Sequence, residues 1–391
     1  FITAPENIAW LLNIRGYDNP TSPIPNCNLV VSKEKIFYLI VEKNKSTKLL
    51  KEKKLKKGQI VDPKNLNDFL KGLKNKNAII DKNTCSLYFE KLFRKRFKII
   101  KREDPIYLLK SRKNKVEIKN MINTHIIDGV ALTKFIYWIK KQKKNINEMY
   151  AVNKLENFRK KNKNYLYPSF KTIAGSGPNA AVIHYSVNKK TNREIKTSDI
   201  FLLDSGGQYK YGTTDVTRTI CFKKPNKEIK DIYTRVLKGH ISVVNYNLKK
   251  NTKGSQIDKV ARKNLNDINL DYPHGTGHGV GYFLNVHEGP QALSKFNKVI
   301  LKEGMVLSNE PGYYKKNYFG VRIENLIYIK RVKHINRFEN LTLVPLEKDM
   351  INYDLLNNKE KKYLKNYHIN VYKKLKKYLN QKEQKWLKSL I

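Results

Sequence analysis

The stretch Tyr272-Pro-His-Gly-Thr-Gly-His-Gly-Val-Gly-Tyr-Phe-Leu-Asn-Val-His-Glu-Gly-Pro290 is unusually rich in histidine and glycine. Its three histidines, His274, His278 and His287, fall within fourteen positions, and five glycines accompany them. Glycine lets a backbone adopt conformations that a side chain forbids. Taken alone, the stretch is equally compatible with a functional site and with an ordinary glycine-rich loop. If it is a site, the rest of the chain must supply partners for these histidines.

Two pairs of acidic residues are the candidate partners. Asp204 and Asp215 are eleven positions apart, and Glu310 and Glu324 are fourteen apart. Asp204 and Glu310 each end an apolar run that is typical of a strand, and Glu324 interrupts another such run. A buried charge is costly unless it is paired or bound to a metal. A hairpin between the members of each pair, with a Pro-Gly turn directly after Glu310, would bring the carboxylates together.

These acids and the histidine loop form a set of five candidate metal ligands: Asp204, Asp215, His278, Glu310 and Glu324. Four carboxylates over-charge one divalent ion, whereas two ions balance them. A pair of ions roughly 3.5–4 Å apart is a known hydrolytic device, and ligation dominated by oxygen favours manganese over the thiolate-rich zinc pattern. The alternative is that each acid makes a strand-end salt bridge with a lysine, which is plausible for one acid but not for all five residues in this order.

The composition indicates a globular protein of two or three domains. The chain has 391 residues, of which 40% are hydrophobic, and it includes 24 Tyr and 15 Phe. We find no apolar run that approaches the roughly 20 residues of a membrane span, and no signal peptide at the first residues. Three scattered cysteines suit free thiols in a reducing compartment. We therefore expect a cytoplasmic protein without a membrane partner.

The net charge of +45 arises from 79 basic and 34 acidic residues. Such an excess ordinarily suggests nucleic acid or an anionic membrane as a partner. Here the basic residues are mostly lysines, and they are dispersed. Arginine, which specific phosphate recognition prefers, is scarce. We interpret the excess as lysine on solvated faces and expect only non-specific binding of nucleic acid.

The pattern along the chain predicts alternating helices and strands. Residues 1–107 read as a small α/β domain with strands at 28–31, 35–41 and 78–81 and a lysine-rich helix between them. Further helices are predicted at 118–139, 146–161 and within 228–266, and strands at 200–204, 305–310, 321–329 and 341–345. The chain is expected to end in one lysine-rich helix with an apolar stripe. No internal repeat is obvious in the sequence.

Four blocks of the sequence resemble X-prolyl aminopeptidase (aminopeptidase P), in the cytosolic-type branch of the pita-bread metallopeptidases. They are Leu203-Asp-Ser-Gly-Gly-Gln-Tyr-Lys-Tyr-Gly-Thr-Thr-Asp-Val-Thr-Arg-Thr219, His274-Gly-Thr-Gly-His-Gly-Val-Gly281 with Leu284-Asn-Val-His-Glu-Gly-Pro290, Asn309-Glu-Pro-Gly-Tyr-Tyr314, and Phe319-Gly-Val-Arg-Ile-Glu-Asn325. The resemblance extends along essentially the whole chain and is loosest in residues 40–107. It implies an α/β (α+β) fold with three parts. Residues 1–107 would form a creatinase/prolidase-type N-terminal-like domain, 108–330 the duplicated pita-bread catalytic domain with a curved antiparallel sheet, and 331–391 a C-terminal extension.

The resemblance also implies a role for each site residue. Asp204 would bind one of two Mn²⁺ ions, His278 and Glu310 would bind the other, and Asp215 and Glu324 would bridge them. His184, His274 and His287 would line the substrate site, Glu310 would also act as general base, and Arg322 would support the ligands. The remaining histidines, His125, His240, His334 and His368, match no functional position of the family.

The resemblance thus implies an enzyme that releases an N-terminal amino acid when proline follows it. A hydroxide that the two ions generate would attack the peptide bond, and the enzyme would be a homodimer. Prolidase-like dipeptide cleavage is one alternative. Another is a non-catalytic pita-bread module that binds nucleic acid or protein, against which the intact ligand set argues. Members of this branch carry one more domain before the segment that begins here. That domain is either missing from this sequence or absent from the protein, and the latter would put the restriction to short peptides and the dimer geometry in doubt.

Overall fold

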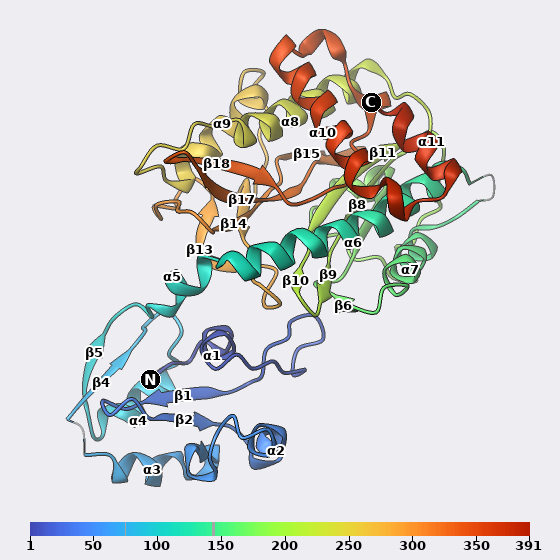
Figure 1. Ribbon diagram of the computed structural model, residues 1–391. Helices are drawn as coiled ribbons and strands as arrows, with labels where there is room; N and C mark the ends of the chain where they lie inside the picture. Colours follow the sequence, from blue (N-terminus) through green and yellow to red (C-terminus); the bar gives the residue numbers. More distant parts are fainter. Residues whose placement is uncertain (75, 143–144) are drawn as a thin grey trace. The chain divides into compact units, whose positions relative to one another are not determined.

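The computed structural model describes residues 1–74, 76–142 and 145–391, which form two compact units, 1–110 and 111–391 (Figure 1). None of the described helices combines the length and the apolar character that crossing a bilayer requires.

The first unit contains two small sheets and short helices. β1 (Asn28–Val31) pairs antiparallel with β2 (Phe37–Ile40), which pairs parallel with β3 (Ile60–Val61). β4 (Asn77–Ile80) and β5 (Lys98–Lys101) form a parallel pair. The helices of this part of the chain are α1 (Pro5–Leu11), α2 (Lys43–Lys51), α3 (Leu66–Gly72), α4 (Leu87–Arg94) and α5 (Ile106–Ser111). The predicted α/β character and the lysine-rich helix are confirmed.

The second unit begins with two helices, α6 (Lys115–Lys140) and α7 (Glu148–Arg159). Asn114 caps α6, because its side chain accepts from the backbone of Glu117 while the Glu117 side chain accepts from the backbone of Asn114. The helix buries the second half of its predicted apolar stripe, including Leu132, Phe135 and Ile139, whereas the earlier positions from Ile118 to Val130 are partly buried. Both helices are thus confirmed.

Two antiparallel sheets follow these helices. The first sheet has the strand order β11-β8-β7 and consists of β7 (Ile173–Ser176), β8 (Ile200–Ser205) and β11 (Val216–Cys221). The second has the order β10-β9-β6 and consists of β6 (Tyr165–Pro168), β9 (Gly207–Tyr209) and β10 (Gly212–Thr213). In this register Asp204 lies opposite both Thr217 and Ile173. Asp215 directly precedes β11, so the predicted hairpin does bring the two aspartates to one end of the sheet.

The order of two helices and then antiparallel strands occurs again in the next segment. α8 (Lys227–Val244) and α9 (Gly254–Asn266) precede a five-stranded sheet in the order β13-β12-β14-β17-β18. Its strands are β12 (Gly277–Gly279), β13 (Glu288–Leu293), β14 (Val306–Asn309), β17 (Asn325–Val332) and β18 (Ile335–Asn340). The structure therefore shows the duplication that the family resemblance implies, although no repeat is obvious in the sequence.

The prediction of one strand at 321–329 was wrong, because these residues belong to two strands, β16 and β17. β15 (Gly312–Lys315) and β16 (Phe319–Arg322) form a hairpin, and the chain then leaves it at Ile323 and Glu324 to enter β17. At this point the backbone N–H of Glu324 donates to the carbonyl of Thr217 instead of a strand neighbour. The connection between Glu310 and Glu324 is thus a complete hairpin and not a simple Pro-Gly turn.

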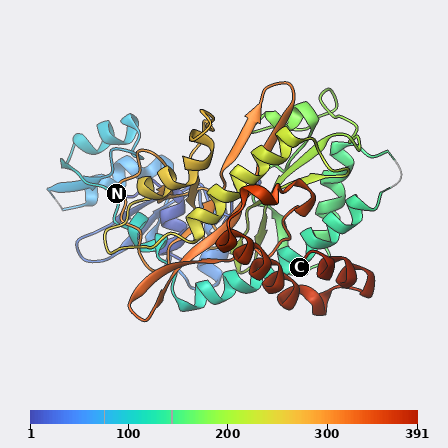
Figure 2. The ribbon, with the colours of Figure 1, turned by 90° about the horizontal axis from the view of Figure 1, so that it is seen from above.

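Two expectations about the last segment were also wrong. Residues 341–345 are buried but form no strand, because Arg218 donates to the carbonyls of Val344 and Pro345 where a neighbouring strand would bind. The terminal helix is two helices, α10 (Asn358–Leu375) and α11 (Gln381–Ser389). Asn380 starts the second one with its own capping box, which ends the continuous stripe. Both helices pack against α6, as Figures 1 and 2 show.

Candidate functional site

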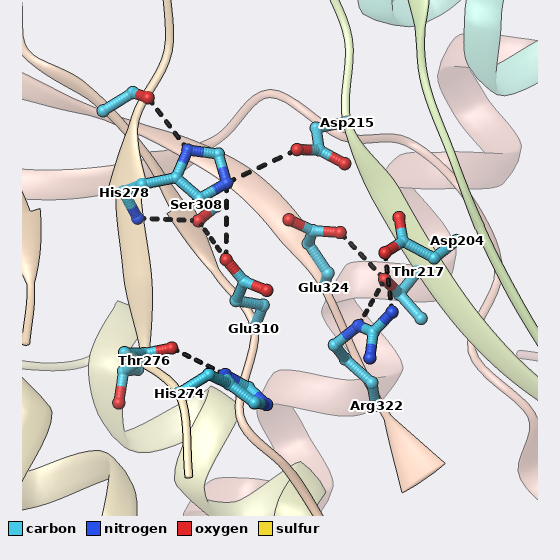
Figure 3. A network of polar contacts seen from close by, with 12 residues as sticks. Asp204, Asp215, Thr217, His274, Thr276, His278, Ser308, Glu310, Arg322 and Glu324 are labelled. Carbon is cyan, nitrogen blue, oxygen red and sulfur yellow. Dashed lines mark hydrogen bonds and ion pairs between the residues drawn. The ribbon is translucent and has the colours of Figure 1, made fainter. Parts of the chain in front are cut away.

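A cavity of about 470 Å³ in the second unit collects every residue that the sequence analysis proposed for the site. They are His184, Asp204, Asp215, His274, His278, His287, Glu310, Arg322 and Glu324. The side chains come from β8, β12 and β16, from the end of β14 and from the connections between strands. Figure 3 shows that the carboxylates point toward one another across a shared space.

Asp204 and Arg322 form the buried edge of this group. Arg322 Nη2 donates to Asp204 Oδ2 at 2.6 Å, and both side chains are almost fully buried. The other oxygen, Asp204 Oδ1, is buried without a hydrogen-bond partner among the described residues. A buried, unsatisfied carboxylate oxygen is costly, and a cation ligated there would satisfy it.

Hydroxyl groups orient the two glutamates. Thr217 Oγ1 donates to Glu324 Oε2 at 2.9 Å, and Ser308 Oγ donates to Glu310 Oε1 at 2.9 Å (Figure 3). Ser308 Oγ also accepts from the backbone N–H of His278. One serine therefore fixes the relative positions of a glutamate and a histidine that lie 32 residues apart in the sequence.

The orientation of His278 is the most informative contact in the cavity. Its Nδ1 lies 2.9 Å from the carbonyl oxygen of Gly279, and a carbonyl only accepts, so Nδ1 carries the ring proton. In the neutral ring Nε2 is then an acceptor, yet it lies 3.5 Å from Asp215 Oδ2 and 3.4 Å from Glu310 Oε1. A neutral ring then places Nε2 and two carboxylate oxygens around one point, and a cation bound there would satisfy all three.

The possible ligand atoms fall into three overlapping groups, each within 4.8 Å: Asp204 with Asp215 and Glu324, His278 with Glu310 and Glu324, and Asp215 with His278 and His287. Asp215, Glu324 and His278 each belong to two groups, whereas Asp204 and Glu310 belong to one each and never share it. This pattern fits two neighbouring cations that share carboxylates.

The electrostatics agree with the geometry. Burial raises the pKa of Asp215 well above its ordinary value, and the charge on Asp204 raises it further. Burial and then the charge on Asp215 raise the pKa of Glu324 in the same way. For Asp204, burial raises the pKa although Arg322 opposes it. Carboxylates that repel one another in a buried site fit divalent cations well, so the residues present suit the dinuclear centre that the sequence predicted.

The other three histidines lie around this group. His287 stacks edge-on against His278, with ring centroids 4.2 Å apart, and keeps more than a third of its surface accessible from the cavity. Desolvation by the cavity walls, and then the neighbouring His278, lower its pKa to about 4. His184 is exposed at the cavity wall. His274 Nδ1 donates to the carbonyl of Gly275, and Nε2 accepts from the Tyr314 hydroxyl, so a substrate contact from its ring would replace one of these bonds.

Sequence reasoning missed three residues that hold the site in place, namely Ser308, Thr217 and Tyr314. The Tyr314 hydroxyl accepts from Arg322 Nη1 at 2.6 Å and thereby connects the arginine to His274. A usable signal existed for the other two. Each lies two positions from a carboxylate in a strand-like run, and residues two apart in a strand share a face.

Comparison with known proteins shows which proteins share this arrangement. Residues 119–331 match Metallopeptidase family M24, residues 1–117 match the Creatinase/Prolidase N-terminal domain, and residues 334–390 match the C-terminal region of peptidase M24. Xaa-Pro aminopeptidase 1 of Dictyostelium discoideum is 37% identical over 413 residues, which cover 100% of this chain and 65% of that protein. The chain thus spans about two thirds of the length of the curated relatives it matches.

Solved structures give the same result. The crystal structure of X-prolyl aminopeptidase from Caenorhabditis elegans, described as a cytosolic enzyme with a di-nuclear active site, matches with a TM-score of 0.91 and 30% identity, covering 99% of this chain and 66% of that one. Prolidase from Pyrococcus furiosus matches with a TM-score of 0.69 and 28% identity, and the match covers 87% of this chain and 95% of the prolidase chain. The predicted fold, a creatinase-type domain before a pita-bread domain, is confirmed.

Proposed function

Because this chain belongs to metallopeptidase family M24, we propose that it removes the N-terminal amino acid from peptides whose second residue is proline. The observation that carries the proposal is the orientation of His278, whose Nε2 faces Asp215 and Glu310 within a five-residue ligand set. The relatives named Xaa-Pro aminopeptidase, at about 37% identity along the whole chain, support the choice of substrate.

We propose that the ligand set holds two divalent ions. Asp204 would bind one, His278 and Glu310 the other, and Asp215 and Glu324 would bridge them, as the overlapping groups suggest. Oxygen-dominated ligation favours Mn²⁺. Bound there, two such ions would polarise the scissile carbonyl and make water a nucleophile at neutral pH.

The chain's own residues would then move protons and orient the peptide. Glu310, held by Ser308 through Oε1, would accept a proton from the attacking water and pass it to the proline nitrogen as the C–N bond breaks. His287 faces the cavity beside His278 and would donate to the carbonyl oxygen as negative charge develops on it. His184, which is exposed on the wall, would contact the peptide.

Two features would set the specificity. The free amine of the substrate would lie near Asp204, so that only the first residue is removed. A proline in second position forms a tertiary amide, which offers no N–H that the site would have to satisfy.

Prolidase-like cleavage of dipeptides is the second candidate, because the Pyrococcus furiosus prolidase shares the fold at 28% identity. We also propose a cytosolic location, by analogy with the Caenorhabditis elegans enzyme. The homodimer that the family resemblance implies stays a prediction.

The test is release of the first residue from an X-Pro-Pro tripeptide by Mn²⁺-loaded and chelator-treated protein, with X-Ala-Pro as control. We expect release that requires both the metal and the proline. Cleavage of X-Pro dipeptides alone would favour the prolidase candidate. The same assay is run on a version of the protein as long as its relatives. If that protein binds two ions and still releases no amino acid, the proposal is contradicted.

A further inference from the structure

The cavity wall holds a cation that the proposed chemistry does not use. Lys171 lines the cavity together with Phe170 and Ile183, and its side chain is exposed to solvent there. Among the residues that the structure describes, Lys171 makes no ion pair or hydrogen bond through its side chain. In a chain with 79 basic residues a lysine on the surface is ordinary, but a lysine on the wall of the catalytic cavity meets the substrate.

The backbone on both sides of Lys171 is anchored, on one side to the residues that follow β8 and on the other to β8 itself, which carries Asp204. Two residues earlier, the backbone N–H of Ser169 donates to the carbonyl of Gly206, and the Ser169 hydroxyl donates to the carbonyl of Thr214. Two residues later, Ile173 lies opposite Asp204 in the register of β7 and β8. The position from which the lysine extends is therefore fixed relative to the metal ligands.

This anchoring also indicates which part of a peptide Lys171 meets. Ile173 lies directly opposite Asp204, and Lys171 precedes Ile173 by only two residues, so the backbone of Lys171 is within about 7 Å of that of Ile173. Lys171 thus lies on the Asp204 side of the cavity, where the proposed function places the amino end of the peptide. Its long stem lets the ammonium group reach across this region.

The charges in the cavity leave Lys171 as its available cation. Four carboxylates carry a formal −4, which two divalent ions would neutralise. Arg322, the other basic side chain on the wall, is buried and directs its three nitrogens to Asp204, Tyr314 and Thr217. A carboxylate on the substrate would therefore find its partner in Lys171.

We propose that Lys171 is a specificity-determining residue that pairs with a carboxylate of the bound peptide, and this inference rests on the proposed function. The carboxylate is either the side chain of an acidic N-terminal residue, which the position beside Asp204 favours, or the free C-terminus of a short peptide. The preferred substrates are thus peptides that combine proline in second position with a negative charge close to the scissile bond.

The test compares matched peptides in the Mn²⁺-loaded protein. Asp-Pro-Pro-amide against Asn-Pro-Pro-amide isolates the side-chain carboxylate, and Asn-Pro-Pro against its amide isolates the C-terminus. We expect the wild type to prefer the charged member of at least one pair by roughly threefold to tenfold, mainly through KM, and to lose this preference as salt rises. Lys171→Gln should abolish the preference and leave turnover of Asn-Pro-Pro-amide within about twofold.

Lys189→Gln is the matched control, because Lys189 is exposed and does not line the cavity, so it should keep the wild-type preference. Binding of analogues whose scissile amide is reduced to a methylene-amine, measured by calorimetry, supplies a readout that needs no turnover. Turnover with equal preference in wild type and Lys171→Gln would overturn the role of Lys171 alone. If the charged analogues bind in a manner that depends on Lys171 but no peptide is turned over, the role of Lys171 is supported and the proposed hydrolysis is contradicted. Equal affinity for charged and neutral analogues would overturn the role of Lys171 whatever the activity.

Discussion

The second unit buries carboxylates in two different ways. Asp128 on α6 is 3% exposed, and Arg159 donates to both of its oxygens while the Tyr209 hydroxyl donates to Oδ1 at 2.7 Å. Burial alone would raise the pKa of Asp128, but Arg159 together with the hydroxyls of Tyr209 and Thr214 holds the pKa below its ordinary value. Asp215 is equally buried, at 3%, and its surroundings raise its pKa instead.

The difference teaches how to separate a structural acid from a metal ligand. Asp128 faces donors, so its charge is compensated within the protein. Asp215 faces His278 Nε2 and further carboxylates, so its charge is compensated only by something that binds. Burial is the same in both places, and the chemistry of the neighbours decides the function.

The largest expected effect is on the side of the metal ligand. Asp215→Asn should lower peptide release by on the order of 10³-fold, because it removes a ligand that both ions would share. The same change should raise the melting temperature of chelator-treated protein, because it removes a charge from a group of carboxylates that repel one another. A lower melting temperature without metal would show that Asp215 is compensated within the protein, as Asp128 is.

Removal of the structural acid should have the opposite profile. Asp128→Ala leaves the fully buried Arg159 without its partner, and breaking such a pair costs about 3–5 kcal/mol of unfolding free energy. Binding of metal by the fraction that remains folded should be unchanged. Urea unfolding and metal analysis of the same sample measure both quantities. Loss of metal with unchanged stability would reverse the roles that the comparison assigns.

Ser308→Ala tests whether the hydroxyls that surround the ligands matter to them. The change frees Glu310 Oε1 and the backbone N–H of His278 from one shared partner, and such losses typically cost about 10–100-fold in metal affinity or activity. Ser308→Thr keeps the hydroxyl and serves as the control for packing. Titration of Mn²⁺ into both variants measures the effect, and equal affinity in the two would show that the hydroxyl is dispensable.

The smallest effect concerns a buried histidine away from the cavity. Burial, with smaller contributions from the charges of Lys348 and Arg218, lowers the pKa of His368 to about 4. Because the folded pKa lies below the unfolded value, the stability that neutral His368 contributes is complete above about pH 6.5 and is lost as the pH falls toward 4. Between pH 7 and 5 this loss is about 2 kcal/mol.

His368→Gln should reduce that loss, since glutamine can accept from the backbone N–H of Leu346 at any pH. The measurement is urea unfolding at pH 7 and pH 5. His334→Gln, at an exposed position, is the control and should behave as wild type. The same acid sensitivity in both variants would mean that other groups cause it.

The ligand set could be found in the sequence because its chemistry is carried by residue types. Acids that end or interrupt an apolar run, such as Asp204, Glu310 and Glu324, stand out by residue type and position, and four acids together with a histidine are typical of a metal site. Ser308 and Thr217 carry no such anomaly, because a hydroxyl in a strand is common. Their spacing of two residues from Glu310 and Asp215 is a weak signal, and only the tertiary structure shows that Ser308 donates to Glu310 and Thr217 to Glu324.

The role of the glycines was only partly visible. At Gly277 a side chain would place its Cβ 2.0 Å from the carbonyl oxygen of Ser308, so the close approach of β14 demands glycine there. At Gly289 an added Cβ would meet nothing within 4 Å. The sequence presents both as members of one glycine-rich stretch. Which glycine is required depends on a strand 30 residues further along the chain, and spacing does not encode that contact.

The same limit explains the error at residues 341–345. The run is apolar and reads as a strand, but the buried guanidinium of Arg218 takes the place of a neighbouring strand and binds its carbonyls. The local pattern of apolar residues predicts that a segment is able to form a strand. Whether a strand forms depends on the backbone or side chain that binds its carbonyls in the folded protein.

The measurement that tests the central claim most directly is the amount of Mn²⁺ that the protein retains after equilibrium dialysis, determined by elemental analysis for wild type, Asp128→Ala and Asp215→Asn. We expect two equivalents per chain in wild type, two per folded chain in Asp128→Ala, and a clear loss in Asp215→Asn. Fewer than one equivalent in wild type, or equal retention in wild type and Asp215→Asn, would contradict the claim.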